Sequence, residues 1–156
     1  MRRSDLELNE YLPYLINRVG SALAARFTED ELAAHRLSIA MWRVLAVLSS
    51  NGGQRQIDLA ELTSIDASTL SRLVTRLVRM GLVTRSRSRT NSREVIVALT
   101  AKGRALLNRL IPVALGLERI LSFGVAKKDL ATVKRTLRRM YANVNRAPDS
   151  RRRNGG

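Results

Sequence analysis

The segment from Asp66 to Gly81 constrains the fold most, because its apolar residues follow helical spacing and both of its ends are marked. On a 3.6-residue wheel the apolar residues share one arc: Leu70, Leu73, Val74, Leu77 and Val78. Asp66 stands where an N-cap accepts orphan backbone N–H groups, and Gly81 follows the last apolar turn, where a left-handed residue ends a helix. The segment is therefore predicted to be a helix with one face directed into a core.

The opposite arc of this predicted helix carries hydroxyls and arginines and no carboxylate: Ser68, Thr69, Ser71, Arg72, Thr75, Arg76 and Arg79. A solvated helix face normally mixes charges of both signs. Small hydroxyl side chains let a backbone approach base edges, and the arginine fork binds guanine or phosphate. This composition favours a helix that lies in the DNA major groove, and the alternative is an ordinary basic face in solvent.

A β-hairpin is predicted directly after Gly81. Three arginines alternate with small hydroxyl residues and so share one face of an extended strand: Arg85, Arg87 and Arg89. A triplet with turn chemistry, Thr90-Asn91-Ser92, precedes a second alternating run: Val95, Val97 and Leu99. A short hairpin after such a helix is typical of a wing, which contacts the DNA backbone or the adjacent minor groove.

Two motifs stand out in this region: DASTLSRLVTRLVRMGLVTR, which begins at Asp66, and the run Asn91-Ser92-Arg93 followed by Val97-Ala98-Leu99-Thr100-Ala101-Lys102-Gly103. With them the chain resembles the MarR family of winged-helix transcription regulators, from about residue 12 to residue 144. The wing of that family has D-x-R and then, six residues after the arginine, L-T-x-x-G. The chain keeps this spacing, but Asn91 replaces the aspartate that is taken to brace the wing arginine in the family. Asn91 retains an oxygen that accepts a hydrogen bond, without the charge assistance of a carboxylate.

The resemblance implies DNA-binding roles for residues at matching positions. Base readout is expected from the predicted helix: Ser68, Thr69, Arg72, Thr75 and Arg76, with Ser71 on the same DNA-binding face. Minor-groove or phosphate contact is expected from the wing: Arg87, Arg89 and Arg93. The expected partner is double-stranded DNA with a pseudo-palindromic operator, and a repressor is favoured over an activator because binding alone occludes a promoter.

The resemblance also implies a small-molecule effector, an aromatic acid or an acyl-CoA thioester, in a cleft between the dimerisation helices and the winged helix. Residues expected near that cleft combine aromatic walls with cations that suit a carboxylate or phosphate: Tyr11, Tyr14, Arg18, His35, Arg36, Trp42 and Arg43. Simpler roles stay open. Trp42 fits a core, His35 fits a loop, and Arg36 or Arg43 fits an ion pair with the acidic run 29–31.

The formal charge of +15 is unevenly distributed. Residues 1–67 hold seven Lys and Arg against nine Asp and Glu, whereas residues 68–109 hold ten against Glu94 alone. Residues 127–156 add ten cations against two acids. A polyanion is the expected partner of such a surface. A membrane surface is the other polyanion, but no apolar run approaches spanning length and no signal-peptide h-region is present, so we expect a cytoplasmic protein without membrane contact.

Several chemistries are disfavoured by the composition. The chain has no cysteine, which removes disulfides, thiolate catalysis and thiol-based sensing. It has one histidine and lacks the HExxH, GxxxxGK[ST], GxGxxG and GxSxG motifs, so no enzyme, cofactor or metal is expected. A sequence-indifferent architectural DNA-binding protein remains the alternative to a regulator, because charge alone suffices for it. The two differ in specificity, which is at least ~10³-fold for a regulator.

The rest of the chain is predicted to be helical around this region. Pro13 fits the start of a first helix, Ser38 is expected to cap a helix over 39–48, and residues 54–57 form a short strand or a linker. Asp58 is expected to cap a helix over 59–64, and Thr100 a long helix that Pro112 kinks.

The last helix carries an apolar seam that needs a partner: Leu130, Val133, Leu137, Met140 and Val144. We therefore expect a homodimer. The predicted fold class is mainly α, a winged helix-turn-helix with a two-stranded β wing and N- and C-terminal dimerisation helices. The predicted organisation is a dimerisation helix and connection at 1–37, a winged helix-turn-helix at 38–99, dimerisation helices at 100–146 and a disordered basic tail at 147–156.

Overall fold

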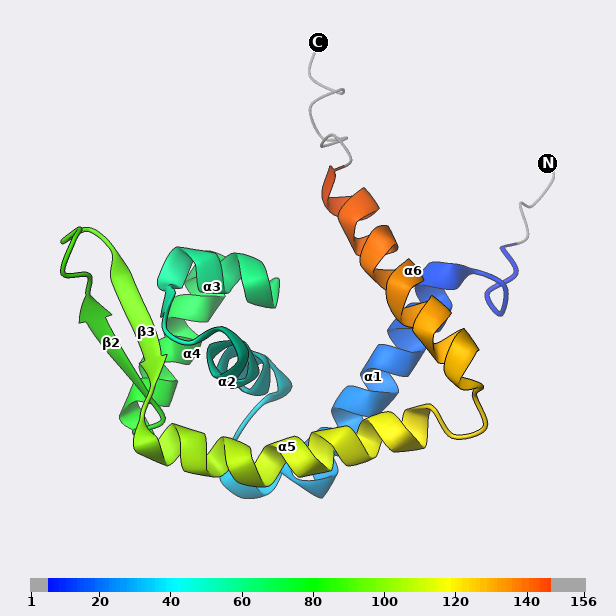
Figure 1. Ribbon diagram of the computed structural model, residues 1–156, viewed down its shortest axis with the longest axis horizontal. Coiled ribbons are helices and arrows are strands. Elements are labelled where there is room, and N and C mark those ends of the chain that lie inside the picture. The colour runs from blue at the N-terminus through cyan, green and yellow to red at the C-terminus, as the bar shows by residue number, and fades with distance from the viewer. Residues whose placement is uncertain (1–5, 147–156) are drawn as a thin grey trace, which may run out of the picture. The chain divides into compact units, whose positions relative to one another are not determined.

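A computed structural model describes residues 6–146, and the expected basic tail at 147–156 lies outside these residues. Helices predominate, and one small sheet accompanies them (Figure 1). The elements in chain order are α1 (Leu12–Asp30), the 3-10 helix η1 (Leu32–His35), α2 (Ile39–Asn51), β1 (Gln54–Arg55), α3 (Gln56–Thr63), α4 (Ala67–Arg79), β2 (Val83–Arg87), β3 (Val95–Leu99), α5 (Ala101–Leu121) and α6 (Lys127–Arg146). The described chain falls into two compact units, one up to Leu117 and one from Glu118 onward.

Helix α4 has the ends that its sequence predicts. The backbone N–H of Thr69 donates to Asp66 Oδ1 at 2.9 Å, which makes Asp66 the N-cap. At the other end Gly81 has a φ of +73°, its N–H donates to the carbonyl of Val78, and the N–H of Leu82 donates to that of Leu77. These bonds satisfy carbonyls that the end of the helix leaves open, and they turn the chain into β2.

Two predicted helix boundaries are wrong. Helix α3 begins at Gln56, before Asp58, because Asp58 uses its carboxylate to bind the Arg55 side chain and caps no backbone N–H. Helix α2 is capped by Ser38 as predicted but continues to Asn51, three residues past the predicted end, and closes at Gly52. Residues 54–55 form strand β1, which resolves the choice between a strand and a linker.

The sheet has the order β1-β3-β2, with antiparallel pairing throughout. Strands β2 and β3 form the predicted wing hairpin, and Arg85 pairs with Val97 and Arg87 with Val95. The prediction that Arg89 continues the same strand is wrong. The ladder ends at Arg87 because the Ser88 hydroxyl accepts the N–H groups of Thr90 and Asn91 and bends the chain into the tip.

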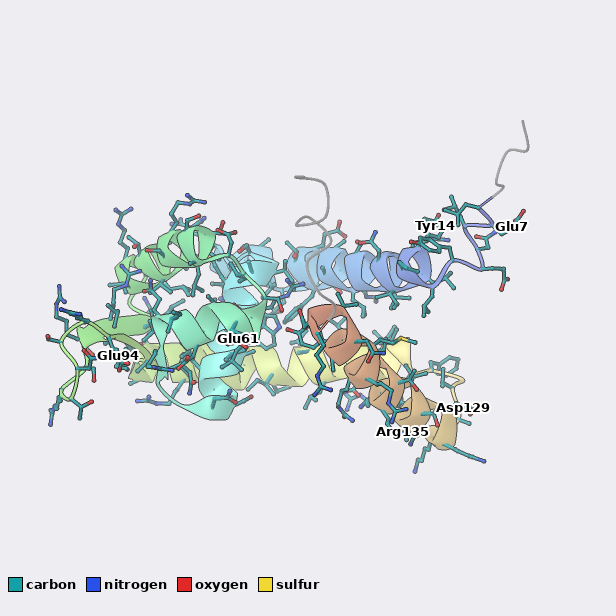
Figure 2. All side chains as sticks on the ribbon, turned by 90° about the horizontal axis from the view of Figure 1, so that it is seen from above. Glu7, Tyr14, Glu61, Glu94, Asp129 and Arg135 are labelled. Carbon is teal, nitrogen blue, oxygen red and sulfur yellow. The ribbon has the colours of Figure 1, made fainter. Side chains whose placement is uncertain are left out.

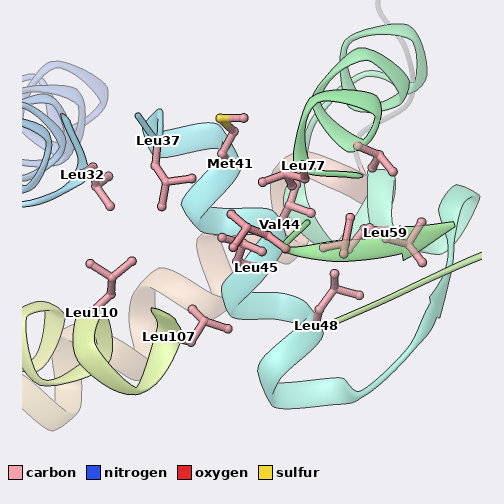
Figure 3. Close-up of a cluster of buried hydrophobic side chains, with 14 of the residues drawn as sticks. Leu32, Leu37, Met41, Val44, Leu45, Leu48, Leu59, Leu77, Leu107 and Leu110 are labelled. Carbon is pink, nitrogen blue, oxygen red and sulfur yellow. The ribbon is translucent and has the colours of Figure 1, made fainter. Parts of the chain in front are cut away.

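The hydrophobic core of the first unit is organised around α2 (Figure 3). Fully buried side chains of α2 meet those of α3, α4 and α5: Met41, Val44, Leu45, Leu59, Leu70, Val74, Leu77, Leu107 and Leu110. Each large aliphatic side chain buried in this way contributes roughly 1.5–3 kcal/mol to folding. The prediction for the apolar arc of α4 is wrong at Val78, which is 39% exposed because it lies at the edge of that arc.

The start of α5 is tied to the turn that ends α4. The Thr100 hydroxyl donates to the carbonyl of Gly81 at 2.6 Å and accepts the N–H of Gly103 at 3.0 Å, so Thr100 caps α5 as predicted. The Thr100 N–H donates to the carbonyl of Leu82 at 3.1 Å. A Cβ atom at Gly103 would clash with that same carbonyl oxygen. In the L-T-x-x-G motif, the threonine therefore caps α5, and the glycine lets the backbone of α5 approach the carbonyl of Leu82.

The second unit has little core of its own. No residue of α6 is buried, and its apolar seam is largely exposed in the single chain, including Val133, Leu137 and Val144. Phe123, in the turn that ends α5 where predicted, is 90% exposed. An ion pair between Lys134 and Glu118 joins α6 to the end of α5. A seam of this kind gains stability only when another surface covers it.

Replacement of Gly103 by alanine tests the close approach between α5 and Leu82. Helix propensity alone favours Ala over Gly by about 1 kcal/mol. The clash with a backbone carbonyl that already accepts a hydrogen bond should instead lower the free energy of unfolding by about 1–3 kcal/mol, as overpacking does.

The matched control is Gly20→Ala in α1, where the added Cβ would meet nothing within 4 Å beyond its chain neighbours and the backbone of its own helix. It should be neutral or stabilising. Urea unfolding monitored by circular dichroism measures both variants, and equal stability changes would contradict the role given to Gly103.

Candidate nucleic-acid interface

The exposed face of α4 has the residues that the sequence placed there. Ser68, Arg72 and Arg76 are exposed, whereas Thr69, Ser71 and Thr75 are half-buried. The Ser68 hydroxyl donates to Asp66 Oδ1 at 2.8 Å, and the Arg72 Nη2 group donates to Thr69 Oγ1 at 3.2 Å. Within residues 6–146 no side-chain hydrogen bond or ion pair holds Arg76. The face therefore presents one oriented guanidinium and one that is open to a partner.

Arg85 on β2 reaches back to α4. Its Nη1 group donates to Thr75 Oγ1 at 3.1 Å and its Nη2 group to the carbonyl of Ser71 at 2.9 Å. The Thr75 hydroxyl itself donates to the same carbonyl at 2.9 Å. Arg85 thus braces the wing against α4, and it occupies two groups on the face that was predicted to contact DNA. Sequence analysis placed Arg85 on the wing but did not foresee this contact.

A second brace involves Arg55, which sequence analysis missed. Its Nε and Nη2 groups bind the two carboxylate oxygens of Asp58 at 2.6 and 2.8 Å, and its Nη1 group binds Glu94 Oε1 at 3.0 Å. Hydrogen bonds to Asp58 and then to Glu94 raise the pKa of Arg55 above its ordinary value. Glu94 lies on the wing hairpin (Figure 2), so Arg55 ties that hairpin to α3. The i,i+3 spacing of Arg55 and Asp58 could have indicated their ion pair, but no local pattern in the sequence indicates the contact between Arg55 and Glu94.

The tip of the wing is arranged by hydrogen bonds to its backbone. Asn91 Oδ1 accepts the backbone N–H of Arg93 at 3.1 Å, and the Arg87 Nη1 group donates to the carbonyl of Ser92 at 2.7 Å. Asn91 therefore braces the main chain at Arg93 and makes no hydrogen bond to its guanidinium. The side chains of Arg89 and Arg93 are exposed and extend beyond the paired strands. The wing carries cations with little internal neutralisation apart from Glu94.

Asp66 is a charged cap at the N-terminal end of this face. Hydrogen bonds from Thr69, first from its side chain and then from its backbone, together with the Ser68 hydroxyl, lower the pKa of Asp66 from 3.8 to about 2. The carboxylate is thus ionised whenever the fold is intact near neutral pH. It fixes the hydroxyl of Ser68 and the first turn of α4.

Two of the seven residues predicted to bind a ligand come together in a hollow. His35 and Arg36 line a cavity of about 610 Å³, together with residues from the end of α4 and the start of α5. The other five do not line it: Tyr11, Tyr14, Arg18, Trp42 and Arg43. Arg18 lies over the ring of Tyr14 at 5.7 Å, and Trp42 is half-buried and meets Phe27 edge-on at 5.0 Å. A ligand cleft formed by these residues stays a prediction.

The described part of the chain holds neither a metal-binding cluster nor a membrane-spanning helix. Among residues 6–146, no three or more His, Cys, Asp or Glu side chains gather where a metal ion could bind. None of the helices described combines the length and apolar character needed to cross a bilayer.

A helix-turn-helix formed by α3 and α4, a carboxylate-free basic helix face and an adjoining two-stranded wing define the class of winged-helix proteins. A sequence model of the MarR family matches residues 37–95. The repressor NicR of Pseudomonas putida is 31% identical over 108 residues, which are 69% of this chain and 68% of that protein. The chain belongs to the MarR family, as the resemblance predicted.

Further similarities fit this membership. The homoprotocatechuate degradative operon repressor of Escherichia coli is 33% identical over 75 residues, and the matched segment spans 51% of that repressor and 48% of this chain. A MarR-family transcriptional regulator from Silicibacter pomeroyi has a TM-score of 0.82 at 31% identity and covers 96% of this chain and 100% of its own. Bordetella bronchiseptica BpsR, whose DNA binding is regulated by 6-hydroxynicotinic acid, has a TM-score of 0.79 at 25% identity, over 88% of this chain and 98% of its own.

Replacement of Asp66 by asparagine tests the charged cap, since asparagine caps a helix without a charge. The lowered pKa means that the ionised form adds stability that is complete above about pH 4 and is lost as the pH falls toward 2. The difference in the free energy of unfolding between wild type and Asp66→Asn should therefore shrink as the pH falls across that range.

Urea unfolding at a series of pH values measures this difference. Asp66→Ser, a second neutral cap, is the control and should follow the same pH profile. A difference that stays constant with pH would mean that the carboxylate does not make the capping bonds.

Proposed function

We propose that the protein is a homodimeric, sequence-specific repressor that binds a pseudo-palindromic site in double-stranded DNA and is released by a small anionic ligand. The face of α4 carries the proposal, because it combines half-buried hydroxyls with the exposed Arg72 and Arg76 and has no carboxylate beyond its N-cap. The position of Arg72 beside Thr69 favours a preorganised contact with a base edge. The proposed activity is binding without catalysis, in the cytoplasm where the DNA lies.

The wing supports a second contact with the same DNA. Arg87, Arg89 and Arg93 extend a basic strip from the end of β2 to the start of β3. Arg55 and Arg85 fix this strip to α3 and to α4, so groove and backbone contacts keep a set spacing. Phosphate contacts of this kind position a protein, and base contacts specify the sequence.

A released state is supported by one similar protein whose DNA binding a small acid regulates and by another that represses a degradative operon. BpsR is regulated by 6-hydroxynicotinic acid, and the E. coli relative represses an operon for the degradation of homoprotocatechuate. We propose an aromatic acid or its acyl-CoA thioester as the ligand of this protein. Its expected site is the cleft near Tyr11, Tyr14, Arg18, His35, Arg36, Trp42 and Arg43.

In vitro selection of bound genomic fragments tests the function as a whole. A repressor of this kind should enrich one pseudo-palindrome whose half-sites lie about one helical turn apart, roughly 10–10.5 base pairs. An architectural protein would show nearly equal affinity for all duplexes at fixed salt, and that outcome would replace the proposal.

Replacement of Arg72 by alanine tests base readout on the selected site. Loss of a bidentate base contact should cost about 1–3 kcal/mol on that site and little on unrelated duplexes, so discrimination falls. Fluorescence anisotropy with both duplexes at fixed salt measures the ratio. If all duplexes lose affinity equally, Arg72 is a phosphate contact.

Arg93→Ala is the matched comparison from the wing. It should weaken binding to all duplexes and reduce the slope of log affinity against log salt by about one ion. An unchanged slope would remove Arg93 from the interface.

Replacement of Leu137 by aspartate tests the dimer. Since α6 buries no residue within the chain, the change should spare the helical signal in circular dichroism but place a charge in the seam between protomers. Light scattering should show a monomer, and operator binding should be lost.

Thr132→Asp is the control, because Thr132 is exposed and lies roughly 140° around the helix from Leu137 at about 100° per residue. It should remain dimeric. A wild-type monomer that binds one site tightly would contradict the proposed assembly.

A further inference from the structure

The hollow at the C-terminal end of α4 is lined by several positively charged side chains. Its walls come from η1, from the turn after α4 and from the first turns of α5. Four permanently cationic side chains line it, Arg36, Arg79, Lys102 and Arg109, and none of its lining residues is Asp or Glu. Three of these four lie outside the predicted ligand set.

These cations lack internal neutralisation. Across residues 6–146, no ion pair within 4.0 Å joins Arg36, Arg79 or Arg109 to a carboxylate. Among the acids, Glu31 contacts a lining residue of the hollow, since its Oε1 lies 3.4 Å from His35 Nε2. Like charges that share a concave surface raise the local potential and attract counter-ions. An anion that enters the hollow would relieve this repulsion.

The rest of the lining is apolar and includes Leu82 and Leu106. A surface that is both cationic and apolar suits an organic anion better than an inorganic ion. A single carboxylate would satisfy one guanidinium fork and leave the other cations unpaired. We propose that this hollow binds an organic anion that carries at least two negative charges beside an apolar body, with Arg79 and Arg109 as its principal contacts.

Lys102 connects this site to the C-terminal end of α4. Its Nζ group donates to the carbonyl of Met80 at 2.8 Å, so it acts as a cap for the C-terminal end of α4. An anion in the hollow competes for that ammonium group, and loss of the cap loosens the turn at Gly81 and Leu82. This regulatory half of the inference rests on the proposed function, whereas the binding site itself does not.

Isothermal titration calorimetry with the full-length protein tests the site with two probes of similar shape. 1-Naphthyl phosphate is mostly dianionic at pH 7.5, since the second pKa of a phosphate monoester is about 6. 1-Naphthoate has the same ring system and one charge. The dianion should bind at least about tenfold more tightly at fixed ionic strength, in line with one additional charge-assisted contact.

Substitutions then locate the site. Arg79→Gln and Arg109→Gln should each weaken 1-naphthyl phosphate by about tenfold or more. Arg119→Gln is the control, because Arg119 is an exposed arginine of α5 outside both the hollow and the predicted cleft. Arg43→Gln, outside the hollow but inside the predicted cleft, tests that cleft as the alternative site. Circular dichroism confirms that each variant is folded. The proposal is overturned if only Arg43→Gln weakens the dianion, or if both probes bind equally.

Two further outcomes separate the site from the function. If Arg79→Gln and Arg109→Gln reduce the salt slope of DNA binding and the dianion does not bind, the hollow is a phosphate contact for DNA and the proposal fails. If the dianion binds as expected but leaves operator affinity unchanged, the regulatory half fails and the site stands. If no operator emerges from the selection, the proposed function fails while calorimetry still decides the site.

Discussion

The joint between α4 and α5 is the constraint on which the basic surface of α4 depends. Thr100 binds the carbonyl of Gly81 through its hydroxyl and that of Leu82 through its N–H, and Gly103 allows the backbones to touch. Each bond joins the end of the exposed basic helix to the start of a helix that enters the core through Leu107 and Leu110. This joint fixes the C-terminal end of α4, and Asp66 closes its N-terminal end.

The wing is fixed by a different kind of interaction. Arg55 and Arg85 are both exposed, and each spans two elements through several hydrogen bonds. Exposed ion pairs add little to stability, but a planar guanidinium that binds on two sides restricts geometry. These arginines thus contribute chiefly to the relative position of α3, α4 and the wing. Part of the positive charge of the chain is structural and is unavailable to a polyanion.

Local signals in the sequence were sufficient for much of the fold. The caps at Ser38, Asp66 and Thr100 and the end of α4 at Gly81 follow from the residue itself and its near neighbours, so they were predicted correctly. The cap at Asp58 failed because the Arg55 side chain competed for the carboxylate. Contacts between residues far apart in sequence left no signal: Arg55 with Glu94, Lys102 with Met80, and Gly103 with Leu82.

The hydroxyls on the exposed face of α4 already make hydrogen bonds within the chain. Ser68, Thr69 and Thr75 were predicted to contact bases, yet each already makes a hydrogen bond to Asp66, Arg72 or Arg85 in the free chain. Each hydroxyl keeps a lone pair for a further bond, but the bond it already makes restricts the direction in which it can contact a base. The guanidinium of Arg76 has no such bond to give up, and that of Arg72 is oriented by Thr69. We therefore propose that discrimination between sequences falls mainly to Arg72 and Arg76, and that Thr69 contributes by orienting Arg72.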